Sequence, residues 1–170
     1  MAPLSEWNYC KNTTLNHNLA KENRDCIVRI NVIVEEEGGG KCSLFKDEFE
    51  VLNLDKIENK LAQREKRNKR KTVDFIFGIE KAREPKNIVL TECKFNYKNV
   101  KNLDMTELDE KRKHSSSLLN YELQIFSTFY LLFQDKIYPE AYRKIRRFNT
   151  DKRNYEAVTI KKLKDKFFNF

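Results

Sequence analysis

Two apolar runs stand out along the chain, because each is rich in β-branched and aromatic residues over the length of a strand. They cover residues 72–80 and 87–95. The residues between them carry charges and Pro85, a composition typical of a turn. We therefore predict two neighbouring strands joined by a short connection.

The pattern of apolar positions also predicts the elements on either side of this pair. Alternation predicts a strand at 26–34, a hairpin partner within 42–52 after a glycine-rich turn, and a last strand at 155–160. Helical spacing predicts one short helix within 8–23, a helix at 54–64 and an amphipathic tail at 161–170. It also predicts a helix over 105–134, which the serines at 115–117 could break. In the long helix, the apolar stripe at 118–133 should pack on the core. The expected fold class is α/β, with a central mixed sheet flanked by helices.

Length and composition narrow the class of protein. A chain of 170 residues suits one domain, which we take as residues 1–170. Basic residues outnumber acidic ones by 34 to 26, so the net charge is +8 and favours a polyanionic partner such as nucleic acid. No apolar run approaches the roughly 20 residues that span a bilayer, so no membrane partner is expected. The N-terminal ten residues do not have the pattern of a signal peptide.

The cysteines and histidines do not form a metal-binding motif. The four cysteines include no C-x-x-C pair, and the two histidines are far apart, so a zinc site is not expected. With no sign of a disulfide framework, we expect a cytoplasmic protein with reduced thiols.

The candidate chemistry lies on the two central strands. Asp74 is the one acid inside the first apolar run. On the second run, Glu92 and Lys94 should point to the same face, because alternate side chains of a strand share a face, while Cys93 points the other way. A carboxylate buried in an apolar strand is costly unless it is paired or holds a metal. Two acids and a lysine that meet at strand ends would suit a divalent cation and an activated water.

An acid on one strand followed by a partner strand ending in Glu-x-Lys resembles the PD-(D/E)xK nuclease superfamily, which has the restriction-endonuclease-like fold. The resemblance rests on residues 72–96, and Val73 stands where the pattern has proline. Other Glu-x-Lys or Asp-x-Lys triplets, such as the one that begins at Glu58, lack the flanking strand and the partner acid. The resemblance implies a metal-dependent nuclease that hydrolyses phosphodiester bonds, more readily of DNA than of RNA.

The resemblance also implies roles for individual residues. Asp74, Glu92 and the backbone carbonyl of Cys93 would bind Mg²⁺ or Mn²⁺, and the catalytic residues would be Asp74, Glu92 and Lys94. Family members often add an acid from an upstream helix, which the pattern here does not identify. They often act as dimers, so a homodimer is an expectation by analogy.

Basic residues near these strands are candidates for phosphate contacts. Six of them crowd into residues 64–71, a run that would otherwise be a solvated linker. The candidate nucleic-acid-binding residues are Arg64, Lys66, Arg67, Lys69, Arg70, Lys71, Lys98, Lys111 and Lys113.

Three alternatives remain open. Asp74 and Lys94 could form a structural ion pair across neighbouring strands. The chain could be a catalytically inactive nuclease-like fold that binds nucleic acid or acts as an immunity or regulatory protein. It could also be an unrelated RNA-binding domain, which should display an exposed aromatic platform.

Overall fold

A mixed seven-stranded sheet forms the centre of the protein, as described by a computed structural model of residues 7–120, 122–149 and 154–169. The order is β2-β3-β4-β5-β6-β7, and the short strand β1 also pairs with β4. Neighbours up to β5 are antiparallel, whereas β5, β6 and β7 run parallel. The strands are β1 (Asn8–Tyr9), β2 (Ile27–Arg29), β3 (Glu50–Asn53), β4 (Phe75–Glu80), β5 (Asn87–Cys93), β6 (Gln124–Leu132) and β7 (Tyr155–Val158).

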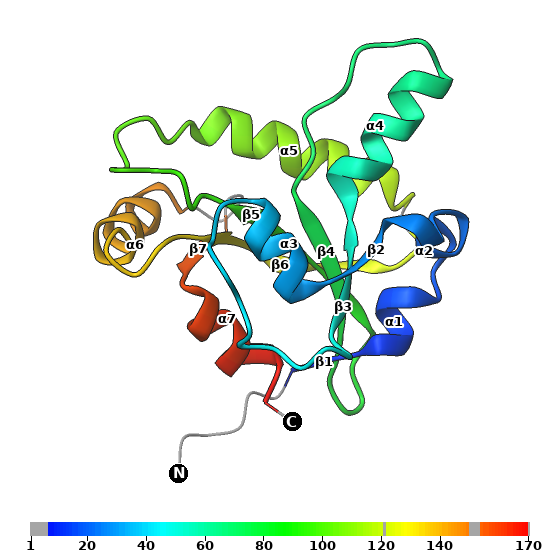
Figure 1. Cartoon of the computed structure of the whole chain (residues 1–170), viewed down its shortest axis with the longest axis horizontal. Coiled ribbons are helices and arrows are strands. Elements are labelled where there is room, and N and C mark those ends of the chain that lie inside the picture. The colour runs from blue at the N-terminus through cyan, green and yellow to red at the C-terminus, as the bar shows by residue number, and fades with distance from the viewer. Residues whose placement is uncertain (1–6, 121, 150–153, 170) are drawn as a thin grey trace.

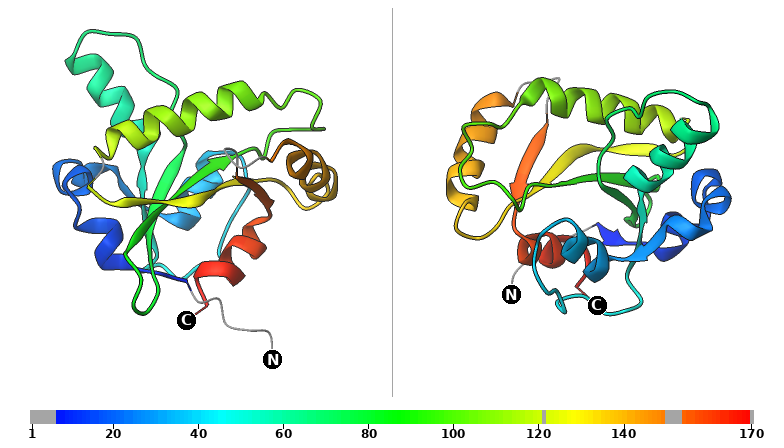
Figure 2. Two further views of the ribbon diagram at one scale, coloured as in Figure 1. Left: turned by 180° about the vertical axis from the view of Figure 1, so that it is seen from behind. Right: turned by 45° about the horizontal axis from the view of Figure 1, so that its top comes forward.

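Helices cover both faces of this sheet (Figures 1 and 2). Alternate residues of the central strands divide between two buried clusters, with Ile76 and Leu90 on the side of α4, α5 and α6, and Phe77 and Val89 on the side of α3 and α7. The parallel pairs need crossover connections, and α5 and α6 provide them. The helices are α1 (Lys11–Leu15), α2 (Asn18–Glu22), the 3-10 turn η1 (Arg24–Cys26), α3 (Ile30–Glu36), α4 (Leu54–Arg64), α5 (Met105–Leu118), α6 (Tyr138–Phe148) and α7 (Ile160–Phe167).

The central prediction of two paired strands is confirmed. Strands β4 and β5 form an antiparallel pair whose register runs from Phe75 opposite Thr91 to Ile79 opposite Asn87. Helix α4 has the predicted bounds, and the last strand and the C-terminal helix also lie near where the apolar pattern placed them. In place of the one short helix predicted within 8–23, the structure has strand β1 and the two short helices α1 and α2.

The strand predicted at 26–34 is wrong beyond its first residues. Only Ile27–Arg29 is a strand, and the chain then turns into helix α3. Ile30, Ile33 and Val34 are buried with helical spacing. This β-branched run therefore fits the alternation of a strand and the spacing of a helix equally. Of the predicted partner at 42–52, only the end belongs to β3. Phe45 and Phe49 enter the core from the irregular segment before it.

The helix predicted over 105–134 is wrong in its second half. Helix α5 ends at Leu118, and Gln124–Leu132 is the interior strand β6. The last four residues of β6 are buried on both faces, as expected for a parallel strand covered by helices. A continuous apolar run of this kind does not distinguish a buried strand from a buried helix. The face predicted to be covered by residues 118–133 is instead covered by α5 and α6.

Candidate active site

The register of β4 and β5 brings Asp74 and Glu92 together. Phe75 is opposite Thr91, so Asp74, one residue before β4, lies beside Glu92 on the same face of the sheet. The backbone N–H of Cys93 donates to Asp74 Oδ2 at 2.7 Å, and the Asp74 carbonyl accepts from the N–H of Leu54 at 3.1 Å. These bonds hold Asp74 at the point where β4 begins and α4 packs against the sheet.

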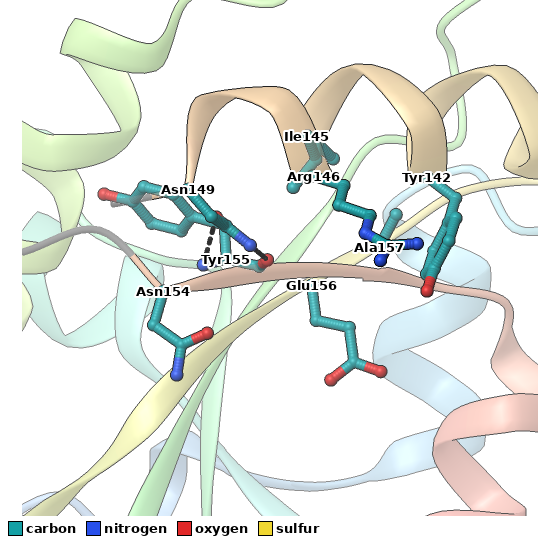
Figure 3. A pocket seen from close by; sticks show the side chains of 8 residues that line it. All are labelled: Tyr142, Ile145, Arg146, Asn149, Asn154, Tyr155, Glu156 and Ala157. Atoms are coloured by element: carbon teal, nitrogen blue, oxygen red, sulfur yellow. Dashed lines mark hydrogen bonds between the residues drawn. The ribbon is translucent and has the colours of Figure 1, made fainter. Parts of the chain in front are cut away.

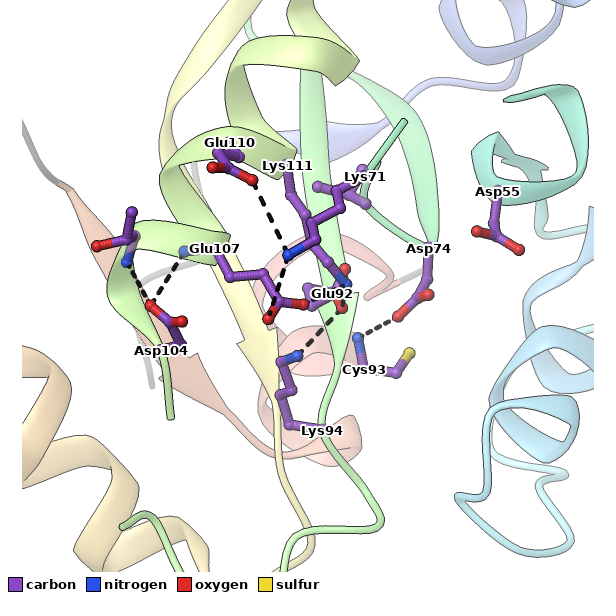
Figure 4. A network of polar contacts seen from close by, with 12 residues as sticks. Asp55, Lys71, Asp74, Glu92, Cys93, Lys94, Asp104, Glu107, Glu110 and Lys111 are labelled. Atoms are coloured by element: carbon purple, nitrogen blue, oxygen red, sulfur yellow. Dashed lines mark hydrogen bonds and ion pairs between the residues drawn. The ribbon is translucent and has the colours of Figure 1, made fainter. Parts of the chain in front are cut away.

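Glu92 is the centre of the polar network drawn in Figure 4. Glu92 is only 2% exposed, and its Oε1 lies 2.5 Å from Lys111 Nζ and 3.3 Å from Lys94 Nζ. The other oxygen, Oε2, is buried and has no hydrogen-bond donor among the described residues. A buried carboxylate oxygen without a donor is costly, so Oε2 is an open acceptor for a further ligand.

The two lysines reach Glu92 from different elements. Lys94 follows β5 and lies on the same face as Glu92, as predicted, while Cys93 packs with the cluster on the other face. Lys111 comes from α5, and its Nζ also lies 3.9 Å from Glu107. Burial favours the neutral form of Lys111, but the contact with Glu92 outweighs it and raises the pKa of Lys111. The Lys111 side chain therefore stays a cation inside the site.

The environment of Asp74 disfavours its charge. Burial, followed by the negative charges of Glu92 and Glu37, raises the pKa of Asp74 to about 8. Burial raises the pKa of Glu37 as well, with Asp55 and Glu92 adding to the effect. For the Cys93 thiol, burial and then the charge of Asp74 raise the pKa well above its ordinary value. The negative charges of the three acids thus outweigh the positive charges of the two lysines at this site.

Glu37 is the acid that sequence reasoning missed. It caps the C-terminal end of α3 and lies close enough to add to the negative potential at Asp74 and Cys93. Residues 26–34 were expected to be a strand and the residues after them a turn, so Glu37 was not placed near Asp74. Lys111 was expected to contact phosphate, yet it lies against Glu92.

The arrangement fits a divalent cation held by few protein ligands. No three His, Cys, Asp or Glu side chains gather into a preformed metal cage within the described ranges. Mg²⁺, however, commonly keeps several waters and binds through one or two carboxylates. The open Glu92 Oε2 and the nearby Asp74 carboxylate, whose charge is disfavoured, supply donors of that chemistry.

The basic run at 64–71 divides into paired and unpaired side chains. Arg67 Nη1 lies 2.5 Å from Oε1 of the fully buried Glu58, which also accepts from the N–H of Arg70 at 2.9 Å. Lys69 pairs with Asp55, and Lys71 lies 3.9 Å from Glu107 and 4.0 Å from Glu110.

Three side chains of the run are exposed and form no ion pair with any described residue: Arg64, Lys66 and Arg70. They remain the most accessible of the predicted phosphate contacts in this segment. The paired side chains of the run, by contrast, anchor the chain between α4 and β4.

The other two predicted phosphate contacts lie apart from Glu92. Lys98 lines a hollow of about 390 Å³ in the loop after β5, and Lys113 is exposed on α5. A separate hollow of about 310 Å³ lies between α6 and β7, lined by Arg146, Asn149 and Glu156 among others (Figure 3). That hollow contains none of the predicted site residues.

No model of a known family, no curated protein and no solved structure matches this chain. Within the part of the chain that the structure describes, no helix is long and apolar enough to cross a membrane.

Proposed function

We propose that this chain is a metal-dependent nuclease of the PD-(D/E)xK type, which hydrolyses phosphodiester bonds of nucleic acid, DNA in preference to RNA. The observation that carries the proposal is the open, buried Glu92 Oε2 beside the half-buried Asp74 carboxylate. A site built only as an ion pair has no need of a second acid in this position or of an acceptor without a donor.

Asp74 and Glu92 would hold Mg²⁺ or Mn²⁺, together with the backbone carbonyl of Cys93. Such a cation supplies Lewis-acid stabilisation of the phosphate and lowers the pKa of a bound water. Glu37 adds negative potential at the same place and is the candidate for the further acid of the family pattern. Asp74 is oriented for this role by the N–H of Cys93 at 2.7 Å.

Lys94 would stabilise the negative charge that develops on the phosphate. Its side chain is 10% exposed and its Nζ lies 3.3 Å from Glu92 Oε1, so Lys94 lies at the carboxylate that would hold the cation. Lys111 balances the charge of Glu92 from the other side at 2.5 Å. We assign it a positioning role, because it contacts the carboxylate and not the expected place of the substrate.

A second candidate function is an inactive nuclease-like fold that binds nucleic acid or a protein. The observation in its favour is that Glu92 Oε1 already contacts two lysines. In that case Lys94 and Lys111 would serve only to neutralise a buried acid, and the basic surface would bind its partner without chemistry.

A cleavage assay separates the two functions. Wild-type protein would be incubated with supercoiled plasmid, linear duplex, single-stranded DNA and RNA, with Mg²⁺, with Mn²⁺ or with a chelator. We expect cleavage only with metal, and its loss in Asp74→Asn and Lys94→Ala. The proposal is wrong if no substrate is cut and the melting temperature of the wild type does not respond to either metal.

A further inference from the structure

The outer surface of α6 combines exposed aromatic rings with cations. Tyr142 and Phe148 are each 39% exposed, and among the described residues only Val32 and Leu44 are comparably exposed large hydrophobic side chains. Arg143 and Arg147 lie one turn apart on the same helix and line one groove together with Phe148. Tyr142 lies beside Tyr138 and lines other hollows, so Phe148 is the exposed ring that shares a groove with these arginines.

A groove of about 460 Å³ follows this surface, between α6 and the loop after β5. Its polar lining includes Lys101, Glu140, Arg143, Lys144 and Arg147, and Phe148 also lines it. Lys144 Nζ donates to the carbonyl of Val100 at 2.5 Å. This bond attaches the loop to α6, so that Lys101 is held beside the arginines.

Three of the four cations that line this groove have no acidic partner in the described part of the chain. Lys101, Arg143 and Arg147 form no ion pair with any described residue, and Glu140 is the single carboxylate in the lining. With Lys144, the lining has four positive charges against one negative, an excess that suits an anionic partner. The exposed ring of Phe148 offers a surface on which a flat apolar group of that partner can stack.

The groove is linked to the candidate active site through one loop. Lys94 Nζ lies 5.3 Å from the ring of Tyr97, and Tyr97 and Lys98 line the 390 Å³ hollow that precedes Val100 along the chain. Both views in Figure 2 place α6 beside this loop, at the end of α5 where the helix begins. A polymer that leaves Lys94 along the loop would reach Lys101 and then α6.

We propose that this groove holds an unpaired stretch of nucleic acid, with a base stacked on Phe148 and its phosphates bound by Lys101, Arg143 and Arg147. An exposed aromatic face beside a basic groove is how proteins hold single strands, since every base offers a flat face, while a duplex keeps its faces stacked inside. That this strand continues to Lys94 as substrate rests on the proposed nuclease function. The binding itself does not.

Equilibrium binding without divalent metal tests the groove alone. The probes are a labelled single-stranded oligothymidine, a duplex of equal length and polyglutamate as an acidic polypeptide. The double variant Arg143→Gln, Arg147→Gln should bind oligothymidine more weakly, with a salt slope smaller by about 1.4, since each lost single-strand phosphate contact contributes about 0.7. Phe148→Ala should weaken binding about 5- to 150-fold, the loss expected for one base-stacking contact.

The matched control removes two positive charges elsewhere. Lys21→Gln with Arg24→Gln changes exposed residues on α2 and η1, on the opposite side of the molecule from α6 in Figure 1. This control should keep the wild-type affinity and salt slope. Phe148→Leu keeps an apolar side chain without an aromatic face and should bind nearly as weakly as Phe148→Ala.

The proposal is overturned if the α6 variants bind oligothymidine like the control, or if the duplex or polyglutamate binds the groove more tightly than the single strand does. Because these measurements involve no cleavage, they stay informative if the wild type proves inactive. Conversely, metal-dependent cleavage with unaltered binding by the α6 variants would support the nuclease and reject the groove.

Discussion

Replacing Lys111 by methionine tests whether the site needs a cation at Glu92. Lys111 Nζ lies 2.5 Å from Glu92 Oε1, and the side chains are 15% and 3% exposed. Methionine keeps an apolar stem of similar length, so the change removes the charge with little loss of packing. It leaves the buried carboxylate with Lys94 alone, at 3.3 Å.

The size of the effect follows from this geometry. Breaking a buried ion pair by removing one partner costs on the order of 3–5 kcal/mol. Because Lys94 remains on the same oxygen, we expect about 2–3 kcal/mol, below that range. For a chain of this length, such a loss lowers the melting temperature by about 4–12 °C.

Metal should replace the missing charge. A cation held by Asp74 and Glu92 at a concentration of about 100 times its Kd adds about 2.7 kcal/mol to the free energy of unfolding. Urea unfolding of Lys111→Met, with and without Mg²⁺ or Mn²⁺, should therefore show a low stability that metal largely restores. The metal-dependent gain should be greater than in the wild type.

Lys113→Met is the matched control, because Lys113 is exposed on the same helix. It should keep wild-type stability and the wild-type response to metal. The reasoning fails if Lys111→Met is as stable as this control. It also fails if Lys111→Met is destabilised but metal restores none of the loss, since Glu92 would then be only an ion-pair partner.

Three further predictions concern neighbouring groups. Burial and the charges of Glu92 and Glu37 raise the pKa of Asp74 to about 8, so the folded protein keeps a proton that the unfolded chain releases near pH 4. Without metal, its free energy of unfolding should therefore fall as the pH rises between about 4 and 8. Urea unfolding at several pH values should show a smaller fall in Asp74→Asn. An equal pH dependence of the unfolding free energy in the two proteins would contradict the raised pKa of Asp74. Lys94→Ala should lose cleavage in the plasmid assay and keep the metal-dependent shift in melting temperature, and retained cleavage would remove Lys94 from the chemistry. Arg67→Met should lower the melting temperature, because it strips the guanidinium from the fully buried Glu58, whereas Arg64→Met should not; identical melting curves would mean that the contact with Glu58 does not stabilise the fold and that Arg67 stays a candidate phosphate contact.

The sequence was most informative where local pattern and tertiary environment agree. The β4–β5 pair could be predicted because both runs are β-rich and Pro85 lies in a connection that cannot continue a strand. The alternation along β5 was sufficient to place Glu92 and Lys94 on one face. Helix α4 could be located because its apolar positions recur only at helical spacing.

The pattern failed where burial on both faces removed its periodicity. The apolar run in β6 lies between helices on each side, so every residue from Phe129 to Leu132 is buried and no alternation remains. The β-branched run in α3 has apolar residues at both spacings, and tertiary packing decided in favour of a helix.

The remainder of the site depends on contacts between distant segments. Glu37 and Lys111 are separated from Glu92 by 55 and 19 positions in the chain, and no local spacing links them. Likewise, the contact of Arg67 with Glu58 becomes visible only after the chain following α4 folds back over that helix. The acids Glu58 and Glu92 thus hold Arg67 and Lys111, two of the predicted basic side chains, away from the exposed surface.

Metal-dependent cleavage of labelled DNA by wild type and Glu92→Gln tests the central claim most directly. Glutamine keeps the shape of Glu92 and removes the charge that would hold the cation. The account predicts products from the wild type with Mg²⁺ or Mn²⁺, none with chelator, and none from a folded Glu92→Gln. Equal cleavage by the two proteins, or none by the wild type with either metal, would contradict it.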